Sequence, residues 1–185
     1  MDDQQAIRFM KKGDIGGLEV LVVRYQVKAI YTAFLITRNE QLAEDIVQET
    51  FLQIYRRIQR FDEKRPFEPY LLRSVVNAAI NYIERDAHCM PLENEQDLSH
   101  TNDILAQAGK TEDEVEYKQL KAEIYQALEK LSPRQRMVIV QRYYLEMSEK
   151  EMSETLSVAP GTIKWLLNSA RQRLQHLLVS DRRAQ

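Results

Sequence analysis

The side chains best suited to bind a polyanion lie near the C-terminus of the sequence. Between Pro160 and Val179 there is no acidic residue, whereas Lys164, Arg171 and Arg173 are basic. A helix of one charge sign after a three-residue turn is typical of a helix-turn-helix, which presents side chains to the major groove of DNA. An ordinary amphipathic terminal helix is the alternative interpretation. The candidate DNA contacts are Thr162, Lys164, Trp165, Asn168, Arg171 and Arg173.

These side chains suit different parts of DNA. The first turns of such a helix approach base edges, whereas later arginines suit phosphates. The amide of Asn168 can contact a base edge at two points. For Trp165 an inward-packed indole is the alternative to an exposed one.

A second group of candidates lies in the middle of the N-terminal half. The segment 61–70 contains three aromatic residues and the basic pair Lys64 and Arg65, and Asn and Arg side chains follow at four-residue spacing. Aromatic rings can stack on unpaired bases, and the polar side chains are expected to share a helix face beside them. The alternative is that Phe67 and Tyr70 only attach the loop to the core. The candidates are Lys64, Arg65, Phe67, Tyr70, Arg73, Asn77, Asn81 and Arg85.

A third group lies on the helix expected at 40–59. Its outward side carries acidic and amide side chains around one apolar residue, Leu52. This composition predicts a surface that docks on a basic protein partner, and a merely solvated helix face is the alternative. The candidates are Asp45, Gln48, Glu49, Leu52 and Gln53.

The elements that position these groups are all expected to be helices. The sequence contains only 5 Gly and 5 Pro, and its apolar residues recur at three- and four-residue spacing. Capping residues such as Asn39, Ser132 and Ser148 mark helix starts. The expected helices are 3–12, 15–36, 40–59, 70–86, 111–131, 133–144, 148–156 and 160–179.

Charge divides the chain into two domains. Residues 86–114 contain 8 acidic and 1 basic side chains, whereas residues 115–185 contain 12 basic and 8 acidic ones. Helical periodicity also fades in the acidic segment, which predicts a flexible linker. We therefore expect an all-α protein with a helical domain at 1–87, an acidic flexible linker at 88–112 and a helix-turn-helix domain at 113–185.

Other classes of protein are disfavoured. Cys89 is the only cysteine, and the three histidines lack metal-ligand spacing, so neither a disulfide, a metal site, a cofactor nor catalysis is expected. The sequence assigns no role to Cys89. The acidic start lacks a signal core, and no stretch is expected to approach the length of a membrane span, so a cytoplasmic location is expected.

The motifs together resemble the extracytoplasmic-function (ECF) group of bacterial sigma-70 factors. The likeness covers nearly the whole chain. Its blocks are Ala43-Glu44-Asp45-Ile46-Val47-Gln48-Glu49-Thr50-Phe51, Phe67-Glu68-Pro69-Tyr70-Leu71 with Asn77, Leu131-Ser132-Pro133-Arg134-Gln135-Arg136, and Gly161-Thr162-Ile163-Lys164 with Ala170-Arg171-Gln172-Arg173-Leu174. The chain departs from the family at Tyr70, where Trp is usual, and at Val76, where Arg is usual.

The resemblance implies a subunit that is not an enzyme itself. It implies that the 40–59 helix binds core RNA polymerase, and that the aromatic loop and the next helix read and melt the downstream promoter element, holding single-stranded non-template DNA. It implies that the 160–179 helix reads the double-stranded upstream element. A stand-alone helix-turn-helix regulator is the alternative function. Whether an anti-sigma factor holds the domains together is left open by the sequence.

Overall fold

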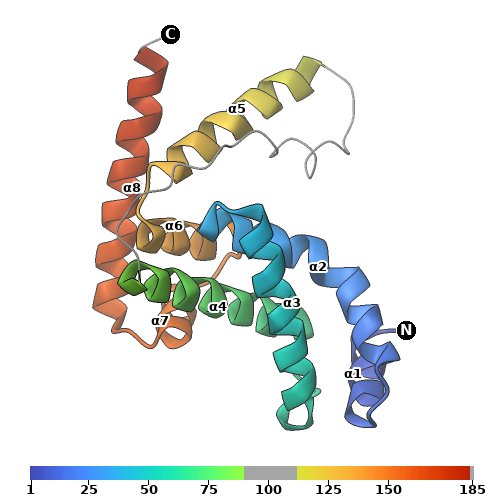
Figure 1. The fold of residues 1–185 in the computed structure, drawn as a ribbon. Helices are drawn as coiled ribbons and strands as arrows, with labels where there is room; N and C mark the ends of the chain where they lie inside the picture. Colours follow the sequence, from blue (N-terminus) through green and yellow to red (C-terminus); the bar gives the residue numbers. More distant parts are fainter. Residues whose placement is uncertain (90–111, 184–185) are drawn as a thin grey trace.

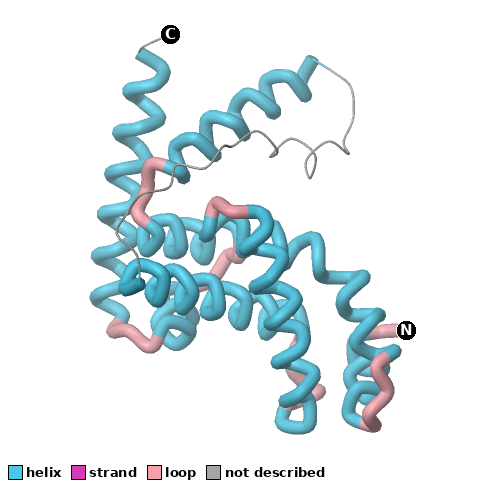
Figure 2. The backbone as a smooth tube through the Cα atoms, viewed as in Figure 1, coloured by secondary structure: helices cyan, strands magenta, loops and turns pink. Residues whose placement is uncertain are grey.

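The computed structural model of the chain describes residues 1–89 and 112–183. All regular secondary structure in these two ranges is helical, which confirms the predicted fold class (Figure 2). The predicted linker at 88–112 lies almost entirely outside the described residues, as do residues 184 and 185.

The chain begins with two helices in close contact. α1 (Asp3–Lys11) is followed by Gly13, whose φ of 85° is a left-handed conformation that favours glycine. α2 (Gly16–Thr37) then approaches α1 so closely that a Cβ on Gly17 would lie 2.2 Å from the Ala6 carbonyl oxygen. Only glycine allows this approach, so Gly17 fixes the angle at which the two helices pack.

α2 is the central helix of the N-terminal half. Its length and apolar composition are sufficient to cross a membrane, so the expectation that no stretch approaches such a span was wrong. α2 packs against α1, α3 and α4, and it buries Leu21, Ala33 and Ile36 completely. This is the environment of a core helix.

α3 (Glu40–Arg57) carries the predicted partner-binding residues. As predicted, Asn39 caps it, because its side chain accepts a hydrogen bond from the Leu42 amide at 2.9 Å. A single 3₁₀ turn, η1 (Ile58–Arg60), ends this helix and leads into the aromatic loop.

α4 (Phe67–Cys89) begins three residues earlier than predicted. Pro69, just before the predicted start, lies in the first turn of the helix, where the backbone N–H groups have no intrahelical acceptor and a missing one costs little.

The C-terminal half is a second set of helices. They are α5 (Glu112–Glu129), α6 (Pro133–Ile139), the π-helical turn η2 (Val140–Tyr144), α7 (Glu149–Leu156) and α8 (Pro160–Arg183). The single helix predicted at 133–144 is thus divided into an α-helix and a π-helical turn.

Two capping boxes mark the starts of α6 and α7. Ser132 and Ser148 each accept a hydrogen bond from a backbone amide three residues on, and Gln135 and Glu151 reciprocate. The helix starts predicted at Ser132 and Ser148 are therefore confirmed. Ser157, with a φ of 52°, ends α7 and turns the chain toward α8.

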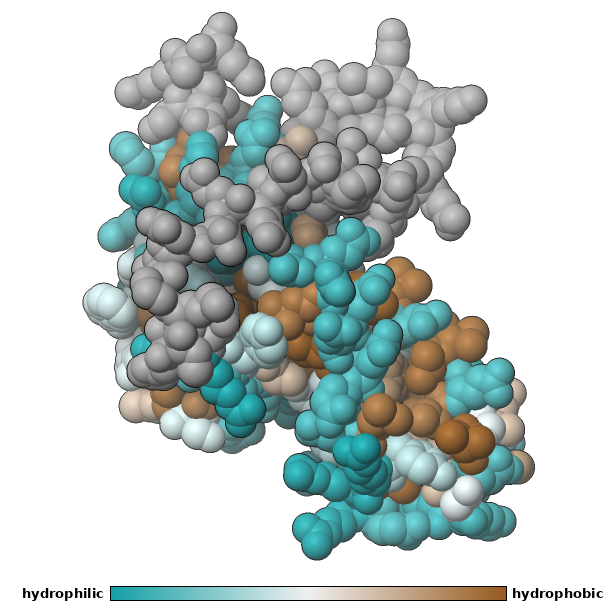
Figure 3. Space-filling model, viewed as in Figure 1, coloured by the Kyte–Doolittle hydropathy of each residue, from teal (hydrophilic) through white to brown (hydrophobic). Residues whose placement is uncertain are grey.

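The two halves of the chain pack against each other through α6. Figure 1 shows α6 between α8 on one side and the helices α2 and α4 on the other, and α4 also contacts α7. We call this contact between α1–α4 and α5–α8 the closed arrangement. Hydrophobic side chains remain on the outside of α2 (Figure 3), where Val23 and Val27 are exposed.

Candidate functional site

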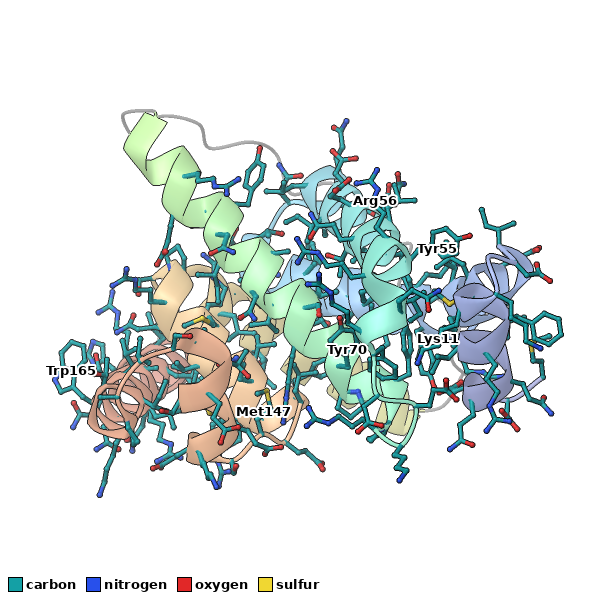
Figure 4. The ribbon with its side chains drawn as sticks, turned by 90° about the horizontal axis from the view of Figure 1, so that it is seen from below. Lys11, Tyr55, Arg56, Tyr70, Met147 and Trp165 are labelled. Atoms are coloured by element: carbon teal, nitrogen blue, oxygen red, sulfur yellow. The ribbon has the colours of Figure 1, made fainter. Side chains whose placement is uncertain are left out.

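The exposed face of α8 carries all six predicted DNA contacts. The helix buries Ile163, Leu167 and Ala170 against the helix-turn-helix core, and this leaves the predicted side chains in solvent. Trp165 is 67% exposed and points away from the body of the protein (Figure 4), so the inward-packed alternative does not apply. The structure thus brings together a surface with the charge and shape to enter a DNA groove.

Arg171 has a partner that the sequence analysis missed. Its Nε donates a hydrogen bond to the Tyr143 hydroxyl at 2.8 Å, and its guanidinium lies 5.7 Å from the centre of the Tyr143 ring. The π-helical turn η2 brings this tyrosine to α8, and no sequence pattern that we used predicts a π-helix. Tyr143 holds the guanidinium in place and extends the polar face beyond α8.

The aromatic loop is anchored by a cluster of rings. Phe61 lies 4.8 Å from Tyr70 and 6.0 Å from Phe67, measured between ring centres. Asp62 also accepts a hydrogen bond from the Lys64 amide at 3.0 Å, which orders the turn. Lys64 and Arg65 themselves extend into solvent from this fixed loop.

Phe67 and Tyr70 differ in what they can contact. Phe67 is only 1% exposed and packs on Tyr25, so its ring presents no free face to a base. Tyr70, in the first turn of α4 (Figure 4), is 36% exposed. We therefore assign Phe67 to the core, which is the alternative reading of the sequence for this residue, and keep only Tyr70 as a stacking candidate.

The four polar residues of α4 do not share one face, contrary to expectation. Four residues advance an α-helix by one turn plus about 40°, so Arg85 lies about 120° around the axis from Arg73. Accordingly Arg73 lines a hollow against α7, whereas Asn81 and Arg85 line a groove against α3. Asn77 is half-buried between them. Val76 is fully buried, so the side chain at this position faces the core.

The predicted docking stripe on α3 is exposed throughout. Leu52 is 44% exposed, whereas Val47, Phe51 and Ile54 on the other face of the helix are buried. Gln53 donates a hydrogen bond to Glu49 at 3.1 Å, and Arg56 lies 3.7 Å from the same carboxylate. Figure 4 shows Arg56 extending outward from α3. The stripe consists of Asp45, Gln48, Glu49, Leu52 and Gln53.

Arg73 is occupied in the closed arrangement. Its guanidinium donates a hydrogen bond at 2.5 Å to Glu151, a residue of α7, and Arg134 bonds Glu84 in the same way at 2.8 Å. Hydrogen bonds from the backbone and side chain of Ser148 lower the pKa of Glu151, and the charge of Arg73 contributes. Glu151 therefore has two roles, as the reciprocal cap of α7 and as the anion that pairs with α4.

Two arginines, one buried and one half-buried, lie close together where the halves meet. Arg136 of α6 is 8% exposed, and Arg38 follows the C-terminus of α2. Burial and the neighbouring Arg38 charge lower the pKa of Arg136 to about 10, and burial also lowers the pKa of Arg38. Three buried guanidinium nitrogens have no hydrogen-bond partner among the described residues: Nε and Nη1 of Arg38 and Nε of Arg136. Closing the molecule therefore partly dehydrates positive charge, which is unfavourable, and the rings of Phe34 and Tyr125, 4.8 and 5.6 Å from the Arg38 guanidinium, offset part of this cost.

An apolar groove of about 860 Å³ runs along the same boundary. Its walls come from α2, α5 and α8, and they include Tyr31, Ile124 and Leu174. Arg24 and Lys28 give its α2 side a basic rim. In the described residues no group of three or more His, Cys, Asp or Glu side chains could hold a metal ion.

Comparison with known proteins gives consistent matches. Residues 21–88 match Sigma-70 region 2, and residues 121–174 match Sigma-70, region 4. The chain is 31% identical over 179 residues to the ECF RNA polymerase sigma factor SigW of Bacillus subtilis, covering 95% of this chain and 96% of that protein. It is 26% identical to the ECF RNA polymerase sigma-E factor of Escherichia coli, over 95% and 94% of the two chains.

The fold also has solved relatives. The chain is similar to the sigma factor RpoE of Bartonella quintana, whose structure was determined in complex with the anti-sigma factor NepR. The TM-score is 0.62 at 21% identity, and the match covers 88% of this chain and 97% of that one.

Proposed function

Because this chain belongs to the ECF sigma factors of the sigma-70 family, we propose which of its surfaces carry out the steps of transcription initiation. The protein is a sigma factor that binds core RNA polymerase, directs it to promoters and helps to melt them. A stand-alone helix-turn-helix regulator is not favoured, because that function would not use the region 2 match at 21–88. Sigma factors are non-catalytic initiation factors.

The first proposed surface is the docking stripe on α3, which binds core polymerase. Its exposed Leu52 and the exposed side chains of Asp45 and Glu49 support this role, since such a surface suits a partner with apolar and basic side chains. We assign this surface and the melting surface to a domain at 1–87, and the linker at 88–112 joins it to the second domain.

The proposed melting surface consists of the exposed ring of Tyr70, the loop residues Lys64 and Arg65, and the polar side chains of α4 that follow Tyr70. A base stacked on an aromatic ring gains about 1–3 kcal/mol whatever its identity, and amides can bond base edges that pairing hides. Lys64 and Arg65 extend into solvent beside this ring and can follow the phosphates of the freed strand. The proposed ligand is single-stranded non-template DNA.

The third surface is the exposed face of α8 in the domain 113–185, which reads the double-stranded upstream element. The observation that carries this proposal is that all six predicted side chains are exposed on a helix with no acidic residue up to Val179. A cytoplasmic location is part of the proposal, because the polymerase and the promoter are there.

We also propose an anti-sigma factor as a regulatory partner. The apolar groove with its basic rim supports this, because it suits an amphipathic helix with acidic residues at its edges. The groove lies between helices of both halves, so such a partner would stabilise the closed arrangement.

Sequencing of transcript starts tests the proposed function. Core polymerase freed of other sigma factors is incubated with sheared genomic DNA, with and without the purified chain, and the 5′ ends of the transcripts are sequenced. We expect new start sites that share two sequence elements at a constant spacing. Start sites identical to those of core polymerase alone would contradict the function.

A further inference from the structure

α1 carries none of the predicted site residues, and it lies before the segment 21–88 that matches Sigma-70 region 2. It nevertheless packs on the 3₁₀ turn η1, which leads into the aromatic loop. Figure 4 shows Lys11 and Tyr55 where the C-terminal end of α1 meets the end of α3. There the Tyr55 hydroxyl donates a hydrogen bond at 3.3 Å to the carbonyl of Gly13. α1 is thus attached to the segment that carries the aromatic loop.

Lys11 is the residue of α1 that joins it to the loop. Its ammonium group donates a hydrogen bond at 2.8 Å to the main-chain carbonyl of Phe61, and it lies 3.0 Å from the Glu63 carboxylate. The side-chain amide of Gln59 in turn donates a hydrogen bond at 2.6 Å to the main-chain carbonyl of Lys11. The Lys11 side chain is only 22% exposed, so water competes little for these contacts. Lys11 therefore holds the segment 59–63 through both its side chain and its main chain.

Glu63 also binds a second cation of α1. Nε of Arg8, one turn before Lys11, donates a hydrogen bond to Glu63 at 3.1 Å. Hydrogen bonds from Lys11 and Arg8 lower the pKa of Glu63, so its carboxylate stays ionised at neutral pH. The Arg8 side chain is 60% exposed, and such a surface ion pair contributes little. Lys11, which is mostly buried and bonds a main-chain group as well, is therefore the stronger contact.

Phe61 links this contact to the proposed melting surface. Its carbonyl accepts the hydrogen bond from Lys11, and its ring lies 4.8 Å from the Tyr70 ring, measured between ring centres. The Phe61 ring is only 8% exposed, so it acts as a support on which Tyr70 rests. A displacement of the Phe61 main chain would move this support and with it the ring of Tyr70. A ring that is held in place before a base arrives loses less entropy when the base stacks on it.

We propose that Lys11 is a positioning residue of the melting surface, which fixes the Phe61 main chain and so holds the Tyr70 ring ready to stack on an unpaired base. α1 then takes part in promoter opening although Lys11 itself does not touch DNA. This inference rests on the proposed melting surface and adds a residue that acts through it. The alternative is that Lys11 only stabilises the fold, and the experiment must separate these two roles.

The test measures binding to single-stranded DNA by the full-length chain in complex with core polymerase. The probe is an oligonucleotide with the non-template strand of the downstream element, taken from a promoter found by sequencing of transcript starts. Lys11→Met removes the ammonium group and keeps the aliphatic stem. Lys12→Met removes the same charge from the exposed neighbouring lysine and is the matched control. We expect Lys11→Met to bind the probe about tenfold more weakly and Lys12→Met to bind like wild type, because a hydrogen bond from a charged group is lost only in the first.

A double-mutant cycle with Tyr70→Ala distinguishes positioning from general stabilisation. If Lys11 acts through the Tyr70 ring, Lys11→Met should change the affinity for the probe by less than about twofold once that ring is absent. A residue that only stabilises the fold would cause the same loss in both backgrounds. Gln59→Ala removes the bond from η1 to α1 without a change of charge, and it should weaken binding by about fivefold in the presence of Tyr70. Circular dichroism and the affinity for core polymerase should be those of wild type in all variants.

Two results would overturn the inference. One is that Lys11→Met and Lys12→Met bind the probe equally well. The other is that Lys11→Met causes the same loss with and without Tyr70. If Lys11→Met does not fold, Gln59→Ala is judged by the same two criteria. Tyr70→Ala separates the inference from the proposed function: if it weakens binding while Lys11→Met does not, only the role of Lys11 is wrong, and if Tyr70→Ala binds normally, the melting surface itself fails.

Discussion

At the scale of single residues, solvent exposure separates side chains that are available to contact DNA from side chains that pack in the core. Phe67 and Tyr70 are three positions apart, yet one is buried in a ring cluster and the other reaches solvent. Arg171 is exposed but held by Tyr143, so its guanidinium is ordered before any DNA arrives. Ordering in advance lowers the entropy lost on binding.

Asn168 and Arg171 are expected to contribute to upstream-element binding in different ways. Asn168→Ala should remove an amide that can bond a base edge at two points, which costs about 1–3 kcal/mol of discrimination at one base pair. Arg171→Ala should weaken binding to all DNA sequences alike. It should also reduce the slope of log affinity against log salt concentration by about one, because one phosphate contact is lost. Both are measured by titrating cognate and scrambled duplexes at several salt concentrations.

The comparison has its own control in the scrambled duplex. If Asn168→Ala weakens cognate and scrambled DNA equally, Asn168 does not read a base. If Arg171→Ala weakens only the cognate duplex, the arginine contacts a base and not a phosphate.

At the scale of elements, the starts of helices could be predicted from the sequence because caps are local. Asn39, Ser132 and Ser148 each bond an amide within three residues, so neighbours along the chain determine them. The prediction that four polar residues of α4 share one face was wrong, because a drift of about 40° per four residues, which helix geometry fixes in advance, adds up to about 120° between Arg73 and Arg85. The π-helical turn η2 could not be predicted either, because packing between distant helices determines it.

The N-terminal turns of α4 are expected to open the promoter. The variant Tyr70→Ala/Asn77→Ala should still bind polymerase and form closed complexes, but it should fail to form open complexes on linear duplex DNA. Unstacking a base costs a few kcal/mol, and the stacking surface that offsets this cost would be missing. Permanganate reactivity of unpaired thymines measures the opening.

A template with a pre-melted bubble is the control for this variant. We expect the bubble to restore most of the activity, because the unstacking is already done. Absence of rescue, in a folded variant that still binds polymerase, would assign these residues to a step other than melting.

At the scale of the whole molecule, the closed arrangement is held weakly. Partly exposed ion pairs such as Arg73–Glu151 and Arg134–Glu84 contribute about 0–1 kcal/mol each. The unpaired nitrogens of Arg38 and Arg136 oppose closure, because opening returns them to water. Closure also occupies Arg73, so α4 and α7 must separate before Arg73 is free.

Glu151→Gln is expected to loosen the closed arrangement without unfolding α7. Glutamine can replace glutamate in a capping box, so the cap on Ser148 is kept while the charge that binds Arg73 is lost. Energy transfer between dyes on α3 and α8 should therefore fall, and the thermal unfolding temperature should stay near that of wild type.

Two further variants serve as controls for this experiment. Glu154→Gln removes an exposed carboxylate from the same helix and should leave the energy transfer unchanged. Glu151→Ala removes the cap as well, so it should also lower stability by about 0.3–1.5 kcal/mol. Equal energy transfer in wild type and Glu151→Gln would show that the ion pair does not hold the halves together.

Equilibrium binding to core RNA polymerase is the most direct measurement of the central claim. The labelled chain is titrated with core polymerase beside the variant Asp45→Lys/Glu49→Lys, and circular dichroism verifies that both are helical. Wild type should bind and compete with other sigma factors, whereas the variant should lose binding because its two carboxylates become cations facing a basic partner. No binding by wild type, or equal binding by both proteins, would contradict this account of how the chain docks on polymerase.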